Sequence, residues 1–402
     1  MEDTLTKISK TLRTSGLGCS ACILAVLAVA TSPSAPAQGT TAAPSPSRVR
    51  VYYIAADEVD WDYAPGGVNK MMGMKFDRNS ALFTERGPHR IGTVYRKAIY
   101  REYTDQTFQH LKPRPPQWEH AGILGPILRA EVGDTIRVVF KNNATQPYSM
   151  HPHGVFYDKA SEGAPYADGT SGADKADDAV SPGNSHVYIW KVPERAGPGP
   201  NDPSSIVWLY HSHVNELKDV ETGLIGAIVV TRRGMAKLDG SPKDVDREFV
   251  CLFMIFDENQ SWYLDHNIQT FTTDPKGVNK IDFASGDPVT GLLPVGSGFS
   301  VANAKFSING FIYANNPLMS MKVGERVRWY LLAFGEQFSV HTPHWHGNVV
   351  LHDGKRTDVV ALMQAQMITV DMLPDNPGTW MFHCHIDDHM ESGMSALYTV
   401  EP

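Results

Sequence analysis

The chain repeats itself. Residues 131–138, which read Glu-Val-Gly-Asp-Thr-Ile-Arg-Val, are matched by residues 322–329, Lys-Val-Gly-Glu-Arg-Val-Arg-Trp. Each stretch is followed by a loop with paired histidines, and a second pair follows in Trp-Leu-Tyr-His-Ser-His at 208–213 and in Trp-Met-Phe-His-Cys-His at 380–385. Repetition at this scale predicts two copies of one folding unit, so whatever one half folds into, the other half must adopt as well.

Each half is rich in short runs of β-branched and aromatic residues, and convincing long amphipathic helices are absent. Gly and Pro are frequent, with 34 and 27 in the chain, as turns between short strands require. We therefore predict an all-β chain of two tandem Greek-key β-sandwich domains, at 48–235 and 246–402, joined in the polar stretch 232–247. The runs that we expect as strands lie at 121–129, 135–140, 186–192, 206–210, 224–231, 248–256, 326–334, 366–372 and 395–400.

The N-terminus has the pattern of a secretory signal peptide. A basic start is followed by an apolar stretch at 17–30 and by Ala35 and Ala37, spaced as a cleavage signal. We expect residues 1–37 to be a cleaved signal peptide and 38–47 a flexible leader, which predicts export to the periplasm or the outside and no stable membrane span in the mature form. An uncleaved anchor or a disordered tail is the alternative.

Beyond that segment only two cysteines remain, Cys251 and Cys384, which excludes a dense disulfide framework. Cys251 lies in the apolar run 249–256 and is expected to be a small buried strand residue. The charge balance, 36 Lys and Arg against 44 Asp and Glu, is mildly acidic, and no basic tract occurs, which argues against nucleic acid as a partner.

Ten of the sixteen histidines fall into four clusters placed symmetrically in the two halves. A lone histidine is usually an ordinary surface or core residue, but paired clusters in a duplicated fold are not explained in that way. Histidines two residues apart on a strand point to the same side, so their imidazoles converge on one site. The clusters are His151 and His153; His211 and His213; His341, His344 and His346; His383, His385 and His389.

The last cluster carries the most specific pattern, because a cysteine stands between two of its histidines. A thiolate, two imidazoles and a weak thioether together form a blue-copper site. Cys384, His389 and Met394 come from this loop and His341 from upstream. Structural zinc is the alternative for a Cys and His site, but it favours several thiolates or a Cys-x-x-Cys pair, and neither is present here.

In type, order and spacing, the four motifs resemble those of the multicopper oxidases. The resemblance implies cupredoxin-like domains and four coppers per chain, which couple one-electron oxidation of a reducing substrate at the type 1 site to reduction of O₂ to water at a three-copper cluster. It also implies that Cys384 is wired to the cluster through His383 and His385. The implied ligands are His151 and His344 for the type 2 copper, and His153, His211, His213, His346, His383 and His385 for the type 3 pair.

The first half lacks a type 1 site. Alignment of the two copies puts Ser212 where Cys384 stands, Leu217 for His389 and Thr222 for Met394, with Tyr148 in place of His341. None of these is a good copper ligand, so we expect one type 1 copper per chain.

Outside the histidine motifs, the sequence is similar to that of ceruloplasmin and its relatives, as in Pro-Glu-Arg-Ala-Gly-Pro-Gly at 193–199 and Asp-Glu-Asn-Gln-Ser-Trp-Tyr-Leu at 257–264. That family oxidises Fe(II) with acidic residues and a histidine beside the type 1 copper. Only Asp388 matches. Phe306, Val301 and Gln337 replace the other three, although Glu336 adjoins the last. Because three of the four residues differ, we expect the electron donor to be a phenolic or aromatic compound or a less specifically bound low-valent metal ion. Ferroxidase activity is less favoured.

Two further sites are implied by the resemblance. The segment 159–178 is similar to a calcium loop, in which Asp174, Asp177 and Asp178 with the Lys159 carbonyl would supply hard oxygen ligands; a solvated acidic loop is the alternative. Tyr157 follows His153 by four residues, at the place of a tyrosine in two-domain laccases, where a phenol could supply an electron or a proton.

Two other functions stay open. A copper nitrite reductase has its type 1 cysteine in the first domain, where this chain has Ser212, and a single catalytic copper. A non-enzymatic copper carrier or binding module needs no complete electron path. The resemblance to two-domain oxidases also implies a homotrimer, in which the first domain of one chain faces the second domain of the next and the clusters form between subunits.

Overall fold

The computed structural model describes residues 47–282, 298–335 and 340–402. The predicted signal peptide, nearly all of the predicted leader, and the positions Glu336 and Gln337 lie outside the described residues. Residues 43–402 form one compact unit. No helix among the described residues is long and apolar enough to cross a bilayer.

Strands far outnumber helices among the described residues, which confirms the all-β prediction. The first half contains β1 (Val49–Asp62), β2 (Val94–Tyr103), β3 (Leu128–Glu131), β4 (Thr135–Asn142), β5 (His151–Pro152), β6 (Ser185–Lys191), β7 (Ser205–His211) and β8 (Ile225–Thr231). The second half contains β9 (Arg247–Asp257), β10 (Ala304–Ile308), β11 (Met319–Lys322), β12 (Val327–Ala333), β13 (Pro343–Trp345), β14 (Val350–His352), β15 (Lys355–Thr357), β16 (Met367–Met372), β17 (Gly378–Cys384) and β18 (Ser395–Glu401).

The helices are short. They are α1 (Arg78–Thr84), α2 (Glu216–Thr222), α3 (Leu264–Phe271), α4 (Phe299–Ala302) and α5 (Asp387–Glu391), with 3-10 turns η1 (Pro116–Ala121), η2 (Lys159–Ser161), η3 (Gly172–Lys175), η4 (Glu194–Ala196) and η5 (Pro275–Gly277). None of them covers a sheet over its length, so the sheets must bury their apolar faces against one another.

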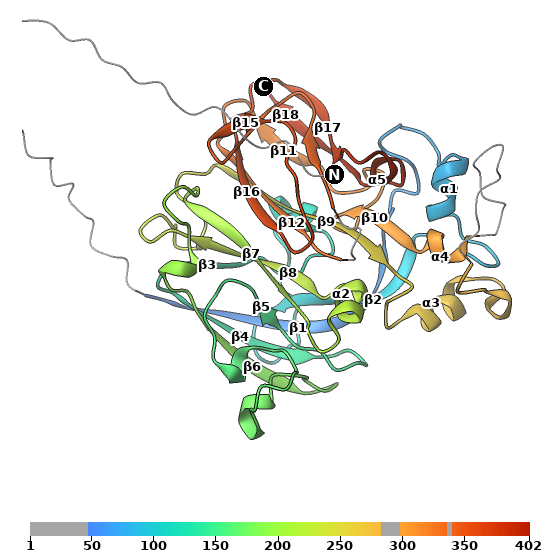
Figure 1. Ribbon diagram of the computed structural model, residues 1–402. Coiled ribbons are helices and arrows are strands. Elements are labelled where there is room, and N and C mark those ends of the chain that lie inside the picture. The colour runs from blue at the N-terminus through green and yellow to red at the C-terminus, as the bar shows by residue number, and fades with distance from the viewer. Residues whose placement is uncertain (1–46, 283–297, 336–339) are drawn as a thin grey trace, which may run out of the picture. The chain divides into compact units, whose positions relative to one another are not determined.

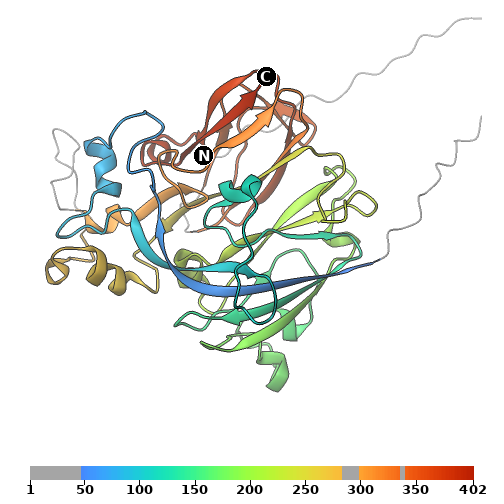
Figure 2. The same ribbon diagram turned by 180° about the vertical axis from the view of Figure 1, so that it is seen from behind.

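Sheet topology repeats between the halves. The first half forms the sheets β2-β1-β4-β6 and β3-β8-β7-β5, and the second forms β10-β9-β12-β16-β14-β15 and β11-β18-β17-β13. In each half the first long strand pairs in parallel with the strand after the Val-Gly motif, as β1 does with β4 and β9 with β12. Figure 1 shows β1, β4 and β6 side by side, and Figure 2 shows the long β1 from behind, in blue.

Burial explains which runs become strands. Every residue of β8, Ile-Gly-Ala-Ile-Val-Val-Thr, is buried, as is every residue of β12. By contrast β6 alternates between buried and exposed positions, as an outer strand of a half-solvated sheet should. One predicted strand is wrong. Residues 121–129 begin in η1, because Pro115 and Pro116 favour a turn, and Gly122 has φ +53°, so the strand starts only at Leu128.

Three apolar cores hold the unit together. One lies mainly in the first half, around Trp190 and Tyr188 but with Tyr263 of the second, and one lies within the second half, around Trp329 and Trp345. The third joins the halves, packing Leu209 and Ile225 with Val250 and Leu332. This extensive shared core joins the described residues of both halves into one compact unit, and the boundaries 48–235 and 246–402 stay a prediction.

Candidate metal centres

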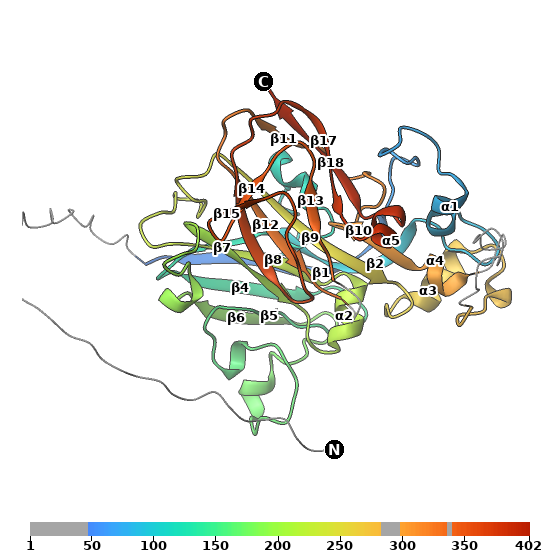
Figure 3. The same ribbon diagram turned by 45° about the horizontal axis from the view of Figure 1, so that its top comes forward.

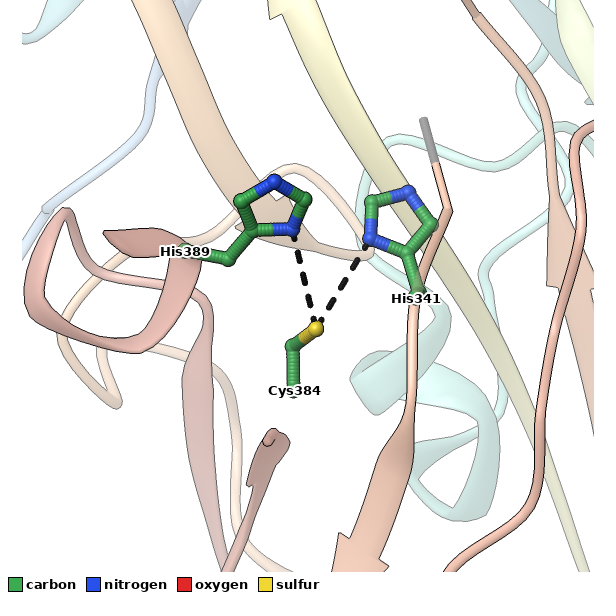
Figure 4. Close-up of side chains that lie close together, drawn as sticks. All are labelled: His341, Cys384 and His389. Carbon is green, nitrogen blue, oxygen red and sulfur yellow. Dashed lines mark hydrogen bonds between the residues drawn. The ribbon is translucent and has the colours of Figure 1, made fainter. Parts of the chain in front are cut away.

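The thiol of Cys384 faces two imidazoles. Its Sγ lies 3.6 Å from Nδ1 of His389 and 4.0 Å from Nδ1 of His341 (Figure 4). Metal–sulfur and metal–nitrogen bonds of about 2.3 and 2.0 Å place a sulfur and a nitrogen ligand roughly 3.5 to 3.7 Å apart. The three donor atoms are therefore spaced closely enough to share one ion.

Local structure places these donors. Cys384 ends β17, and α5 follows directly and carries His389 (Figure 3). The loop closes through backbone bonds from Cys384 N–H to the carbonyl of Met394 and from Met394 N–H to the carbonyl of His389. His341 is held by a two-way backbone pairing with Leu362. Cys384, His341 and Met394 are fully buried, and His389 is 8% exposed.

Electrostatics favour a neutral, metal-binding set. Burial, with the neighbouring His389, lowers the pKa of His341 to about 3. Burial also lowers the pKa of His389, although Asp388 opposes the shift. Burial raises the pKa of the Cys384 thiol, while N–H donors from Thr342 and Ile386 act in the opposite direction. The imidazoles thus keep free lone pairs near neutral pH, and a soft thiolate with two imidazoles fits copper.

A second cluster of histidines adjoins this site in the same half. His344 pairs with His383 across β13 and β17. Nε2 of His383 lies 3.1 Å from Nδ1 of His344 and 3.1 Å from Nε2 of His346. The ring of His385 lies 5.0 Å from that of His344. Nitrogens at this separation suit ligands of a shared ion, and His344, His346 and His383 form such a group.

The first half repeats the arrangement. His151 pairs with His211 across β5 and β7, as His344 does with His383. Nε2 of His153 lies 3.1 Å from Nε2 of His211, and the ring of His213 lies 5.2 Å from that of His151. Burial lowers the pKa of His153 to about 4 and that of His211 well below its ordinary value.

Carbonyl groups hold three of these rings in a ligating orientation. Nδ1 of His151 lies 2.7 Å from the carbonyl oxygen of Glu162. Nδ1 of His211 lies 3.0 Å from the carbonyl oxygen of Ser212, and Nδ1 of His383 lies 2.8 Å from the carbonyl oxygen of Cys384. An N–H donated to a carbonyl leaves the lone pair on the opposite nitrogen, Nε2, as histidine metal ligands require. The sequence motifs did not reveal these carbonyls.

The two half-clusters do not meet. Within the described residues, every hydrogen-bond and ring contact between the eight histidines joins members of the same half. The first set opens onto a cavity of about 460 Å³ lined by His151, His153, Phe156, Tyr157 and Arg195.

Two other predicted residues lie beside the histidines. The ring of Tyr157 contacts that of His151 at 5.8 Å between centroids. Asp388 is exposed on α5 next to His389. Phe306, one of the positions at which the sequence departs from the expected iron-oxidising residues, contacts the His389 ring at 5.3 Å between centroids. The roles of Tyr157 and Asp388 stay predictions.

The acidic side chains predicted to bind calcium have other partners or face solvent in the structure. Asp177 is fully buried and accepts the N–H of Gly163 at 2.7 Å, whereas Asp178 pairs with Lys175 at 3.2 Å. Asp174 is exposed in η3. The Lys159 side chain pairs with Glu162 and Asp168. These acids form no metal-binding group among the described residues, and calcium binding stays a prediction.

Comparison with known proteins defines the class. Two family models, each described as multicopper oxidase, match residues 117–234 and 292–402. The chain belongs to the multicopper oxidase family.

Relatives within that class are larger. The chain is 45% identical over 355 residues to Ferroxidase HEPHL1 of Homo sapiens, covering 88% of this chain and 29% of that protein. It is 41% identical over 362 residues to hephaestin of Mus musculus (89% and 30%), and 38% identical over 356 residues to ceruloplasmin of Homo sapiens (87% and 30%). The chain thus spans about three tenths of these relatives.

Solved structures share the fold. A crystal structure of a multicopper oxidase matches with a TM-score of 0.52 at 20% identity, covering 88% of this chain and 89% of that one. A copper nitrite reductase from Nitrosomonas europaea matches with a TM-score of 0.51 at 17% identity, covering 88% and 93%.

Proposed function

We propose that this protein oxidises a low-valent metal ion, Fe(II) first among them, one electron at a time, and delivers four electrons to O₂ to form water. One observation carries the proposal: Cys384 faces His341 and His389, while the residues on either side of it, His383 and His385, belong to the histidine cluster. Copper bound in these positions would supply the one-electron and O₂-reducing chemistry.

Residues of this chain would hold both the electron-accepting copper and the O₂-reducing cluster. His341, Cys384 and His389, with Met394 as the axial thioether, would hold one type 1 copper. The eight remaining histidines would hold one type 2 and two type 3 coppers, four per chain in all. Burial excludes water from Cys384, and its covalent bonds to His383 and His385 provide the path between the two sites.

Relatives and surface charge favour Fe(II) over a phenol. The relatives that are 38 to 45% identical to this chain over the aligned residues include one named a ferroxidase. The exposed carboxylates Asp387, Asp388 and Glu391 lie on α5 around His389, where they would attract a cation. The proposal of Fe(II) revises the earlier expectation of a phenolic or aromatic donor. That expectation rested on Phe306 and Val301, which replace residues that the family uses to oxidise iron.

The test is O₂ uptake by copper-loaded protein with Fe(II), Cu(I) or a simple phenol as the only donor. We expect Fe(II) to give the largest kcat/KM, and Asp388→Ala to raise KM for Fe(II) more than KM for the phenol. A phenol oxidised faster than Fe(II) would refute the choice of substrate. Nitrite reduction without O₂ uptake would instead favour the nitrite reductase alternative, and copper binding without either activity a carrier.

We further propose that each cluster forms between two subunits of a homotrimer. The separation of the eight histidines into two same-half sets, and the cavity beside the first set, support this arrangement. A head-to-tail contact of this kind either closes into a ring by rotation or grows into a filament, and three two-domain chains would close the ring. We also propose export through residues 1–37, so that copper is loaded outside the cytoplasm.

A further inference from the structure

A pair of hydrogen bonds braces the ligand loop of the second half. Thr342 precedes His344 by two residues. Its backbone N–H points at Sγ of Cys384 from 3.4 Å, and its Oγ1 accepts the backbone N–H of His385 at 3.1 Å. These bonds fix the spacing between the strand that carries His344 and the loop that carries His385.

The first half contains the same brace. Ser149 precedes His151 by two residues. Its backbone N–H donates to Oγ of Ser212 at 3.0 Å, and its Oγ accepts the backbone N–H of His213 at 3.0 Å. Ser149 therefore corresponds to Thr342, and Ser212 to Cys384, in contacts as well as in sequence. Both serines are fully buried.

The two braces differ in what lies beyond the central residue. Sγ of Cys384 faces the imidazoles of His341 and His389. The hydroxyl of Ser212 donates instead to Oδ2 of Asp219 at 2.7 Å. Asp219, on α2, is fully buried, and its carboxylate is the partner of Ser212 as the two imidazoles are the neighbours of Cys384.

Three donors hold that carboxylate in one position. Besides the Ser212 hydroxyl, Oδ2 accepts the backbone N–H of Asn215 at 3.0 Å, and Oδ1 accepts Nε1–H of Trp262 at 2.9 Å. Within the part of the chain that the structure describes, the Asp219 carboxylate makes no hydrogen bond to His211 or His213 themselves. Its effect on the ligands must pass through Ser212 and Ser149.

We infer that Asp219 is a positioning residue that replaces the type 1 copper in bracing the first half-cluster. The inference rests on the proposed function, because it assumes that His151, His211 and His213 bind cluster copper. In the first half, the hydrogen bond from Ser212 to Asp219 holds Ser212 without any metal. In the second half, Cys384 would be tied to His341 and His389 only through a bound copper. Outer residues that orient metal ligands typically contribute about 10- to 100-fold to metal affinity.

Two variants test the link. Ser212→Ala removes the hydroxyl without changing charge. Asp219→Asn keeps the shape of the side chain, but its amide has a single acceptor oxygen and faces three donors, so one N–H must oppose another. Glu221→Gln is the matched control, since Glu221 is a buried carboxylate on the same helix that binds the N–H of Asp257 instead.

Each full-length protein is loaded at graded copper concentrations, and three quantities are measured: total copper per chain, the intense blue absorption of the type 1 site, and the electron paramagnetic resonance signal of the type 2 copper. We expect Ser212→Ala and Asp219→Asn to need about 10-fold more copper to fill the cluster, with blue absorption per chain unchanged. Glu221→Gln should load as the wild type does.

Cluster loading equal to wild type in both variants would overturn the inference. Parallel loss of blue absorption and cluster copper in both variants would also overturn it, because that result indicates a general folding defect. Wild-type protein that never shows a type 2 signal would instead refute the proposed function itself, which separates the two failures.

Discussion

Acidification should weaken the contact between the two halves through one histidine. His120, in η1 of the first half, is 3% exposed. Its Nε2 accepts the backbone N–H of Val250 in β9 at 3.1 Å, so Nδ1 must carry the proton that is shared with the carbonyl of Gln117 at 3.0 Å. Both ring nitrogens are satisfied only in the neutral form, because a proton on Nε2 would oppose the Val250 N–H.

The size of the effect follows from the pKa. Burial lowers the pKa of His120 from 6.5 to about 3. The unfolded chain therefore binds a proton below pH 6.5 that the folded chain refuses, so stability is lost as pH falls from 6.5 toward 3. At roughly 1.4 kcal/mol per pH unit, the loss is about 2 kcal/mol at pH 5 and about 5 kcal/mol once pH reaches the folded pKa.

Denaturant unfolding of wild type and His120→Gln at pH 7.5 and pH 5 tests the argument. Glutamine can still accept the Val250 N–H but does not titrate, and it loses one hydrogen bond, worth about 1 kcal/mol. We expect the variant to be less stable than wild type at pH 7.5, and the gap to shrink or reverse by about 2 kcal/mol at pH 5. Titration of distant groups cancels in the difference. A gap that is equal at both pH values would refute the reasoning.

Three further outcomes are expected. Cys384→Ser should abolish the intense thiolate–copper absorption and oxidase turnover while the cluster remains largely filled, measured by visible absorption and copper content; a blue Cys384→Ser protein would exclude the type 1 assignment. Because the Tyr157 ring contacts His151, Tyr157→Phe should slow turnover or change how the O₂-reacted enzyme decays in stopped-flow measurements. Unchanged kinetics would show that Tyr157 has no role in the reaction with O₂. Light scattering should give the mass of three chains, with activity lost on dilution; a fully active monomer with complete copper content would contradict clusters shared between subunits.

Much of the fold followed from periodicity and repetition. Runs such as 225–231 are apolar enough that burial in a sheet is their only stable outcome. The sequence duplication predicted two copies of one folding unit, and the pairing of β1 with β4 does recur in that of β9 with β12. The error at 121–129 arose because an apolar run does not reveal a backbone turn. Gly122 adopts φ +53° beneath the carbonyl of Asn309, a residue far away in the chain.

For the candidate sites, the sequence by itself determined which donors exist, because a Cys between histidines and paired histidines on strands are local patterns that strand geometry directs to one side. Only the tertiary structure decided how those donors are held. The bond between Ser149 and Ser212 joins residues 63 positions apart, whose proximity depends on the packing of whole sheets. The carbonyls of Ser212 and Cys384, by contrast, are only one residue along the chain from the rings of His211 and His383 that they orient. A hydrogen bond needs two groups within about 3 Å, and no local pattern fixes that distance between residues 60 positions apart.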